Sequence, residues 1–125
     1  MKTIKLTRRI NATPEEIYLA LVNPFTIELW SGEPAVMSEV SETEFSLLDG
    51  NITGKNLSFI PNKEIKQIWY FGEDTDSMVT IRLFPDKSNT QVWVEHTGIP
   101  EEAYDNMLDG WNHFYLDPLK DFFEL

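Results

Sequence analysis

Residues 101–124 read EEAYDNMLDGWNHFYLDPLKDFFE, and this stretch decides the fold. Large apolar residues recur in it every three or four positions, the spacing that places side chains on one face of an α-helix. The stripe consists of Tyr104, Met107, Leu108, Trp111, Tyr115, Leu119 and Phe122. It is ~27 Å long at a rise of ~1.5 Å per residue. We therefore expect a long C-terminal helix that buries one face.

Two residues disturb this helical pattern. Pro118 has no backbone N–H, so it should either kink the helix or remove one backbone hydrogen bond. Gly110 weakens the middle of the helix but allows a neighbouring element to approach closely. The prediction is one helix over residues 101–124, and the choice between a kink and a missing bond stays open at this point.

The preceding part of the chain, residues 35–97, changes to a period of two, which is typical of β-strands. The expected strands are residues 35–40, 43–48, 51–60, 63–71, 77–84 and 89–97. Short breaks with turn residues separate them, among them Asp49-Gly50-Asn51 and Glu73-Asp74-Thr75-Asp76. Such breaks imply hairpins, so the strands form an antiparallel meander that must curl around the helix. Gly54 inside a strand predicts a bulge or a sharp bend.

One strand and two short helices are expected at the start of the chain. Residues 3–10 alternate as a strand. Thr13 is then a helix N-cap, Pro14 takes the first helical position, and Glu16 closes a capping box. A second short helix follows from Pro24 to Trp30. The predicted class is α+β: a curved antiparallel sheet of six to seven strands wrapped around a long C-terminal helix, with two short helices after the first strand.

The composition limits the classes of protein and partner. The 125 residues suit one domain, residues 1–125. The formal net charge is −11, which repels polyanions, so we expect no nucleic-acid partner. The charge is explained by solubility, and the sharper alternative is a basic protein partner. Aromatic residues make up 13% of the chain, and rings of this size either fill a core or line an apolar pocket.

The chain has no cysteine, so it has no disulfide, thiolate nucleophile or thiolate metal site, as suits a reducing compartment. Residues 1–6 lack the continuous apolar run of a secretory signal. No segment approaches the ~18 apolar residues of a membrane span. We therefore expect a cytoplasmic protein with no membrane span.

A set of motifs spread along the chain carries a family resemblance. The motifs are Ala12-Thr13-Pro14-Glu15-Glu16-Ile17-Tyr18, Ala20-Leu21, Trp30-Ser31-Gly32, Phe45-Ser46-Leu47, Asp49-Gly50, Ile52-Thr53-Gly54, Ile68-Trp69, His96-Thr97-Gly98-Ile99-Pro100, Gly110-Trp111 and Leu119-Lys120. In this order they resemble the C-terminal domain of the activator of the heat-shock-protein-90 ATPase and its stand-alone bacterial homologues. That family belongs to the START-related, Bet v 1-like superfamily, so the resemblance implies the helix-grip fold.

The resemblance implies several functions, because lipid carriers, polyketide cyclases and co-chaperone modules share this scaffold. Two departures from the family pattern bear on function. The eukaryotic co-chaperone has a separate N-terminal chaperone-binding domain, which we do not expect in this chain. Pro118 also interrupts a helix that the family continues unbroken, which affects the mouth of any cavity.

Eight residues are candidates for contact with a ligand between sheet and helix. Six are large apolar residues: Trp30, Phe45, Trp69, Met107, Trp111 and Phe114. Gln67 shares the parity of Trp69, and His96 shares the parity of two valines, so both are expected to point inward. The alternative is that the aromatic residues fill the core and that His96 is a hydrogen-bonded sheet histidine.

The sequence gives little support for a catalytic site or a metal site. His113 lies four residues from Asp109 and from Asp117, but such a cluster on a helix is a solvated polar stripe more often than a metal site. No nucleophile has a base at a recognisable spacing. We expect no metal, no cofactor and no catalytic residue.

Three functions stay open from the sequence. The first is a noncatalytic domain that binds a small apolar molecule in a cavity between sheet and helix. The second is a protein-interaction module linked to a chaperone, as monomer or homodimer. The third is a cyclase-type enzyme, which requires inward polar residues such as Arg8, Gln67 and His96 to converge on one cavity.

Overall fold

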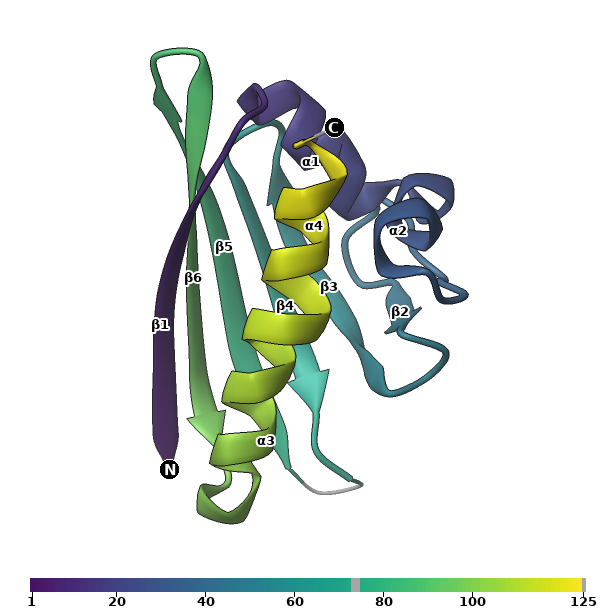
Figure 1. The fold of residues 1–125 in the computed structure, drawn as a ribbon. Coiled ribbons are helices and arrows are strands. Elements are labelled where there is room, and N and C mark those ends of the chain that lie inside the picture. Colours follow the sequence, from purple (N-terminus) through teal and green to yellow (C-terminus); the bar gives the residue numbers. More distant parts are fainter. Residues whose placement is uncertain (73–74, 125) are drawn as a thin grey trace.

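A curved sheet carries the fold in the computed structural model, which describes residues 1–72 and 75–124 (Figure 1). Its strands lie in the order β1-β6-β5-β4-β3-β2, and every neighbouring pair is antiparallel. The strands are β1 (Lys2–Ile10), β2 (Glu44–Leu47), β3 (Ile52–Ile60), β4 (Glu64–Tyr70), β5 (Asp76–Asp86) and β6 (Asn89–Ile99). The first and last strands of the chain are thus neighbours, and the short β2 is the far edge.

Two short helices follow β1, as predicted: α1 (Pro14–Val22) and α2 (Pro24–Ser31). The capping box is present, because the backbone N–H of Glu16 donates to Thr13 Oγ1 at 3.2 Å and the N–H of Thr13 donates to Glu16 Oε1 at 3.0 Å. Helix α2 ends at Gly32, whose φ of 75° favours glycine.

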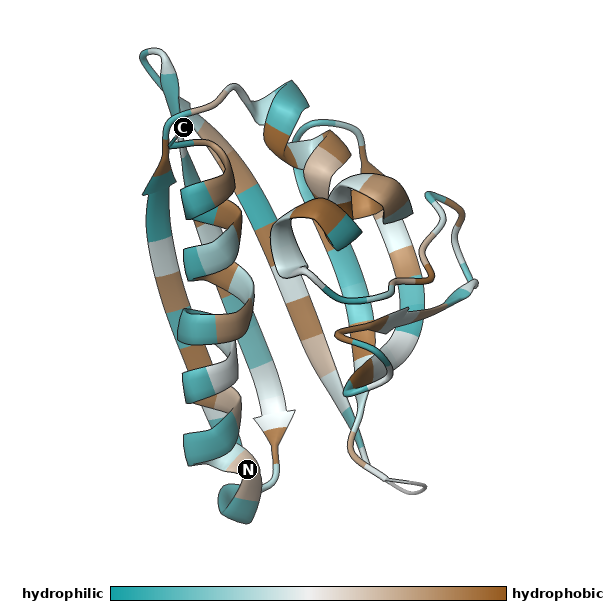
Figure 2. Ribbon diagram, turned by 45° about the vertical axis from the view of Figure 1, so that its right-hand side comes forward, coloured by the Kyte–Doolittle hydropathy of each residue, from teal (hydrophilic) through white to brown (hydrophobic). Residues whose placement is uncertain are grey.

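The C-terminal helix lies along one face of the sheet, as expected (Figure 1). It consists of a 3₁₀ turn η1 (Glu101–Ala103), α3 (Tyr104–Asp109), a π-helical segment η2 (Gly110–Leu116) and α4 (Asp117–Phe122). Hydrophilic residues follow one side of it and hydrophobic residues the other (Figure 2). The predicted apolar stripe is confirmed, because Trp111, Tyr115 and Leu119 are buried.

The π-helical segment answers the question that Pro118 left open. In a regular α-helix the ring of Pro118 would meet the carbonyl of Phe114, four residues earlier. In the wider turn the N–H of Asp117 donates to the carbonyl of Asn112, five residues earlier. The helix therefore passes Pro118 without ending, and Leu116, which the predicted stripe did not include, lies in the core.

Two expectations about the strands need correction. Residues 35–40 were expected to form a strand, but they contribute only an isolated bridge between Val36 and Ser46. The pairing stops there because the carbonyl of Ser38 accepts a hydrogen bond from the side chain of Asn56 at 3.2 Å, and not from the backbone N–H of a neighbouring strand. The described sheet therefore has six strands, the lower of the two predicted numbers.

The irregularity predicted at Gly54 lies two residues further on, between Asn56 and Ser58 in the pairing of β3 with β4. Gly54 instead allows the backbone of Ile68 and the ring of Phe45 to approach its Cα closely. A Cβ atom at Gly54 would lie 1.9 Å from the carbonyl oxygen of Ile68 and 2.7 Å from Phe45 Cζ. The turn expected at residues 73–76 includes residues 73 and 74, which lie outside the described part of the chain.

Candidate functional site

A chain of hydrogen bonds joins the C-terminal helix to the sheet through His96. The indole Nε1 of Trp111 donates to His96 Nδ1 at 3.0 Å. Because Nδ1 accepts, the imidazole proton lies on Nε2, which donates to Ser77 Oγ at 2.7 Å, and Ser77 Oγ donates to the carbonyl of Trp69 at 2.9 Å. Burial lowers the pKa of His96 to about 4, so the ring is neutral at pH 7. His96 is thus the hydrogen-bonded sheet histidine of the alternative expectation.

Gln67 takes part in a second buried network. The indole Nε1 of Trp69 donates to Gln67 Oε1 at 2.9 Å, and Gln67 Nε2 donates to Asn56 Oδ1 at 3.0 Å. Asn56 Nδ2 in turn donates to Thr43 Oγ1 at 3.3 Å. The Gln67 amide points inward, as parity predicts, but its polar atoms are used within the protein. This network holds the loop before β2 against the sheet.

Four aromatic rings pack where the helix crosses β4. Trp69 and Trp111 stack with their ring centres 4.6 Å apart and their planes 12° apart. Tyr115 lies 4.6 Å from Trp111 and 5.1 Å from Trp30, measured between ring centres. Trp30 Nε1 donates to the carbonyl of Ala20 at 2.7 Å, so its polar atom is satisfied inside the fold. Much of the aromatic set therefore fills the core.

A cleft of about 620 Å³ opens beside this cluster. Its walls are the C-terminal helix, the segment after α2, and the turn between β2 and β3. The lining residues are Ser31, Glu33, Leu48, Asp49, Asn51, Ile52, Trp69, Asn106, Met107, Gly110, Trp111, Phe114 and Tyr115. The volume falls in the range of ligand sites, and the composition, aromatic walls with a few polar groups, is typical of them.

The structure brings four of the eight predicted residues together at this cleft: Trp69, Met107, Trp111 and Phe114. Phe114 was expected between sheet and helix, but its side chain is 57% exposed and lies at the rim of the cleft.

The other four predicted residues do not line the cleft and belong to the buried part of the fold. They are Trp30, Phe45, Gln67 and His96. Ligand contact stays a prediction for all eight candidates.

The turn between β2 and β3 has an unusual backbone. Leu48, Asp49 and Gly50 are consecutive residues with positive φ, at 53°, 54° and 87°. For a leucine this conformation costs roughly 1 kcal/mol or more. The side-chain amide of Asn51 donates to the carbonyl of Leu48 at 2.8 Å and holds the turn closed. The result is a rigid wall that carries Asp49 and Asn51 at the cleft.

Tyr115 supplies a polar atom to the cleft wall. Its side chain is only 4% exposed, and its hydroxyl has no hydrogen-bond partner among the described residues. No fully buried polar side-chain atom within residues 1–72 and 75–124 lacks a partner, so the hydroxyl retains some accessible surface, and Tyr115 is one of the residues that line the cleft. Burial raises the pKa of Tyr115, and the phenol stays protonated at neutral pH.

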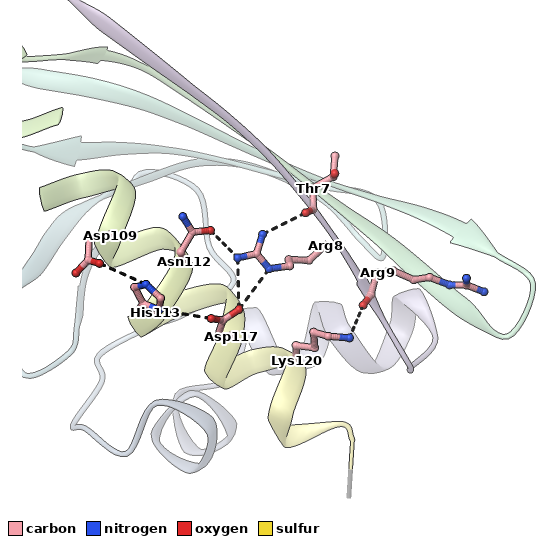
Figure 3. A network of polar contacts seen from close by, with 8 residues as sticks. All are labelled: Thr7, Arg8, Arg9, Asp109, Asn112, His113, Asp117 and Lys120. Carbon is pink, nitrogen blue, oxygen red and sulfur yellow. Dashed lines mark hydrogen bonds and ion pairs between the residues drawn. The ribbon is translucent and has the colours of Figure 1, made fainter. Parts of the chain in front are cut away.

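Outside the cleft, a polar network joins the helix to β1 (Figure 3). Arg8 donates to Asn112 Oδ1 and, at 3.4 Å, to Asp117 Oδ1. His113 is exposed and lies 3.4 Å from Asp109 and 3.6 Å from Asp117, measured from ring nitrogen to carboxylate oxygen. In the described residues no group of three or more His, Cys, Asp or Glu side chains has an arrangement that could hold a metal ion.

The residues required by the enzyme alternative do not meet. Arg8 donates a hydrogen bond to Asn112 at the surface of the C-terminal helix. Gln67 is hydrogen-bonded to Asn56, and His96 to Trp111 and Ser77. None of the three lines the cleft. No helix in the described part of the chain has the length and the apolar character to cross a lipid bilayer.

Sequence reasoning missed the polar rim of the cleft. Asp49 and Asn51 were read only as turn residues, and Glu33 and Asn106 were not considered. The dipeptide Asp49-Gly50 signalled a turn, but only the folded backbone shows that this turn faces the helix.

The comparisons with known proteins agree with this architecture. The family model described as Activator of Hsp90 ATPase homolog 1-like protein matches residues 11–124. The chain is 25% identical over 123 residues to the mouse activator of 90 kDa heat shock protein ATPase homolog 1, an alignment that covers 96% of this chain and 36% of the mouse protein. The chain thus spans about a third of the length of the curated relatives it matches.

Solved structures share the fold at low identity. An HSP90 activator from Plasmodium falciparum has a TM-score of 0.90 at 21% identity, covering 98% of this chain and 96% of that one. The Aha1 dimer from Colwellia psychrerythraea has a TM-score of 0.87 at 23% identity, covering 100% and 98%. These likenesses confirm the predicted helix-grip architecture. Because the family model matches nearly the whole chain, the chain belongs to the Activator of Hsp90 ATPase homolog 1-like protein family.

Proposed function

We propose that this chain is a noncatalytic binding domain that receives an apolar group in the cleft beside the C-terminal helix. The observation that carries the proposal is a cleft of about 620 Å³ in which the half-buried Leu48, Ile52 and Met107 and the exposed ring of Phe114 are accessible beside the buried cluster of Trp69, Trp111 and Tyr115. Aromatic walls in a concave site bury a large part of a ligand's apolar surface, and each Å² removed from water contributes roughly 25 cal/mol.

A titration with a neutral apolar fluorophore, N-phenyl-1-naphthylamine, tests this proposal. The expected result is saturable binding of one probe per chain. Gly110→Leu should lower the affinity at least tenfold, because Gly110 lines the cleft and a Cβ atom built there meets nothing within 4 Å. The leucine side chain should therefore start into open space and occupy part of the cleft.

His113→Leu is the matched control, since it adds a leucine to the same helical segment at a position outside the cleft lining. This variant should bind the probe as the wild type does. Binding that does not saturate, or that is equally strong in Gly110→Leu, would overturn the proposal.

A second candidate function is a protein-interaction module linked to a chaperone. It is favoured by the relatives, of which the mouse protein is described as an activator of the 90 kDa heat-shock-protein ATPase and aligns with 96% of this chain. The acidic balance of the chain, −11, fits a basic partner surface. We propose that this function is carried out in the cytoplasm. Proteins in that reducing compartment are not stabilised by disulfides, so a chain without cysteine is not at a disadvantage there.

An ATPase assay with the 90 kDa chaperone of the same organism tests the second candidate. A faster ATP turnover that saturates with the chain supports it, and an unchanged rate together with no co-sedimentation contradicts it. Native mass spectrometry of the purified chain reports a retained small molecule and the number of subunits in one measurement. A homodimer is part of the proposal because the Colwellia neighbour was solved as a dimer.

A further inference from the structure

We propose that the cleft selects apolar molecules that carry a cationic group, such as a quaternary ammonium. This inference rests on the proposed binding function of the cleft and adds the chemical class of its ligand. It follows from the charges, the rings and the polar atoms that meet at the same walls.

The charged side chains of the lining all have one sign. Glu33 and Asp49 line the cleft, and no Lys, Arg or His is among the lining residues. Within the described residues, neither carboxylate forms an ion pair, although nine ion pairs occur elsewhere. Both side chains are therefore free to face a ligand. The net charge of −11 adds a long-range attraction for cations at low salt.

The aromatic walls suit the same chemistry. Phe114 lines the cleft, and the face of an aromatic ring attracts a cation within ~6 Å of its centre. Trp69 and Trp111 also border the cleft, but they are buried and stacked on each other, so they add apolar surroundings and no open ring face. Phe114 is exposed at the rim, so its ring is accessible from solvent without any rearrangement. An apolar body with a cationic end can therefore contact rings and carboxylates at the same time.

Uncharged polar atoms complete the site. Tyr115 lines the cleft with a hydroxyl that has no partner within residues 1–72 and 75–124, and Asn106 adds an amide from the helix. The closed turn at Leu48–Asn51 fixes the backbone that carries Asp49 at the cleft. An anionic amphiphile would meet two carboxylates and no cation, and is expected to be excluded.

Three naphthyl probes with the same apolar ring test the inference by calorimetric titration. They are (2-naphthylmethyl)trimethylammonium, 2-naphthylmethanol and 2-naphthylacetate. We expect the ammonium probe to bind about tenfold more tightly than the alcohol, and the carboxylate probe to bind most weakly. Raising the salt concentration should reduce the advantage of the ammonium probe, because screening weakens its attraction to exposed carboxylates.

Two double variants separate a local effect from the overall charge. Glu33→Gln with Asp49→Asn should lower the affinity for the ammonium probe about tenfold and leave the affinity for the alcohol unchanged. Glu101→Gln with Glu102→Gln makes the same change in net charge at exposed positions outside the cleft, and should leave both affinities unchanged.

Three results overturn the inference alone: equal affinities for the ammonium probe and the alcohol, a preference for the carboxylate probe, or equal effects of the two double variants. In each case the binding of 2-naphthylmethanol, and its loss in Gly110→Leu, would still support the apolar cleft. If none of the three probes binds, the proposed binding function falls together with the inference.

Discussion

Trp111 Nε1 and His96 Nδ1 are 3.0 Å apart, and this one hydrogen bond connects the middle of the C-terminal helix to strand β6 of the sheet. Both side chains are fully buried. The bond also selects the imidazole tautomer, because the nitrogen that accepts from Trp111 cannot carry the proton. Packing and hydrogen bonding therefore depend on each other at this position.

Trp111→Phe should lower the free energy of unfolding by ~2–4 kcal/mol. The change removes the donor to His96, which costs roughly 1–3 kcal/mol when an acceptor is left buried, and it adds the cost of a cavity. Urea unfolding followed by far-UV circular dichroism measures the difference. Trp93→Phe, on the half-exposed outer face of β6, is the control and should change stability much less. Equal losses in the two variants would contradict the role given to Trp111.

The stability should depend on pH through His96. Its pKa is about 4 in the folded protein, against 6.5 for an unperturbed histidine, so the unfolded chain binds more protons between these values. The stabilisation is complete above pH ~6.5 and is lost as the pH falls toward 4, by ~3 kcal/mol over the whole window. His96→Gln does not titrate, so the slope of stability against pH should be smaller in this variant. Identical slopes would show that His96 titrates normally in the folded state.

Gly54→Ala should destabilise the sheet by more than ~2 kcal/mol. The added methyl group would lie 1.9 Å from the carbonyl oxygen of Ile68, a backbone atom, and the strands would have to separate. Thermal unfolding should show a clear decrease in Tm. An unchanged Tm would mean that β3 and β4 can move apart at this point without cost.

Gly110→Ala also adds one methyl group, but it should stabilise the protein. Gly110 has a helical φ of −60°, and a Cβ atom there meets nothing within 4 Å. Alanine in a helix is favoured over glycine by roughly 0.5–1 kcal/mol, so Tm should rise by a few degrees. A lower Tm would indicate that the π-helical segment requires glycine at its first residue.

Most of the fold could be predicted because its signals are local. The apolar stripe through Trp111 and Leu119, the capping box at Thr13 and the alternation in β6 each depend on neighbours in sequence. The spacing could not decide Leu116 and Phe114. Leu116 lies three residues before Leu119 and Phe114 three residues after Trp111, so both fit a helical repeat, and only the folded chain shows that the first is buried and the second exposed.

The candidate site was predicted only in part, since it depends on contacts between distant segments. Its aromatic wall followed from the helix stripe and from the parity of Trp69. The carboxylates did not, because Glu33 and Asp49 reach the cleft through turns whose direction is set by packing. Residues 35–40 show the same limit. Their alternation predicts a strand, but the side chain of Asn56 donates to the backbone carbonyl of Ser38, which would accept from the neighbouring strand in a continuous β-ladder.

The π-helical segment has a consequence for changes in chain length. Each residue of an α-helix turns the chain by ~100°, so a one-residue deletion in α3 would rotate Leu119 away from the sheet. The wide turn of η2 holds one residue more than an α-turn, as the bond from Asp117 to Asn112 shows. Loss of a residue at 112–114 would convert it to an ordinary turn and leave both flanks in phase. Homologous chains could therefore gain or lose a residue in this segment while the rest of the helix packs against the sheet in the same way.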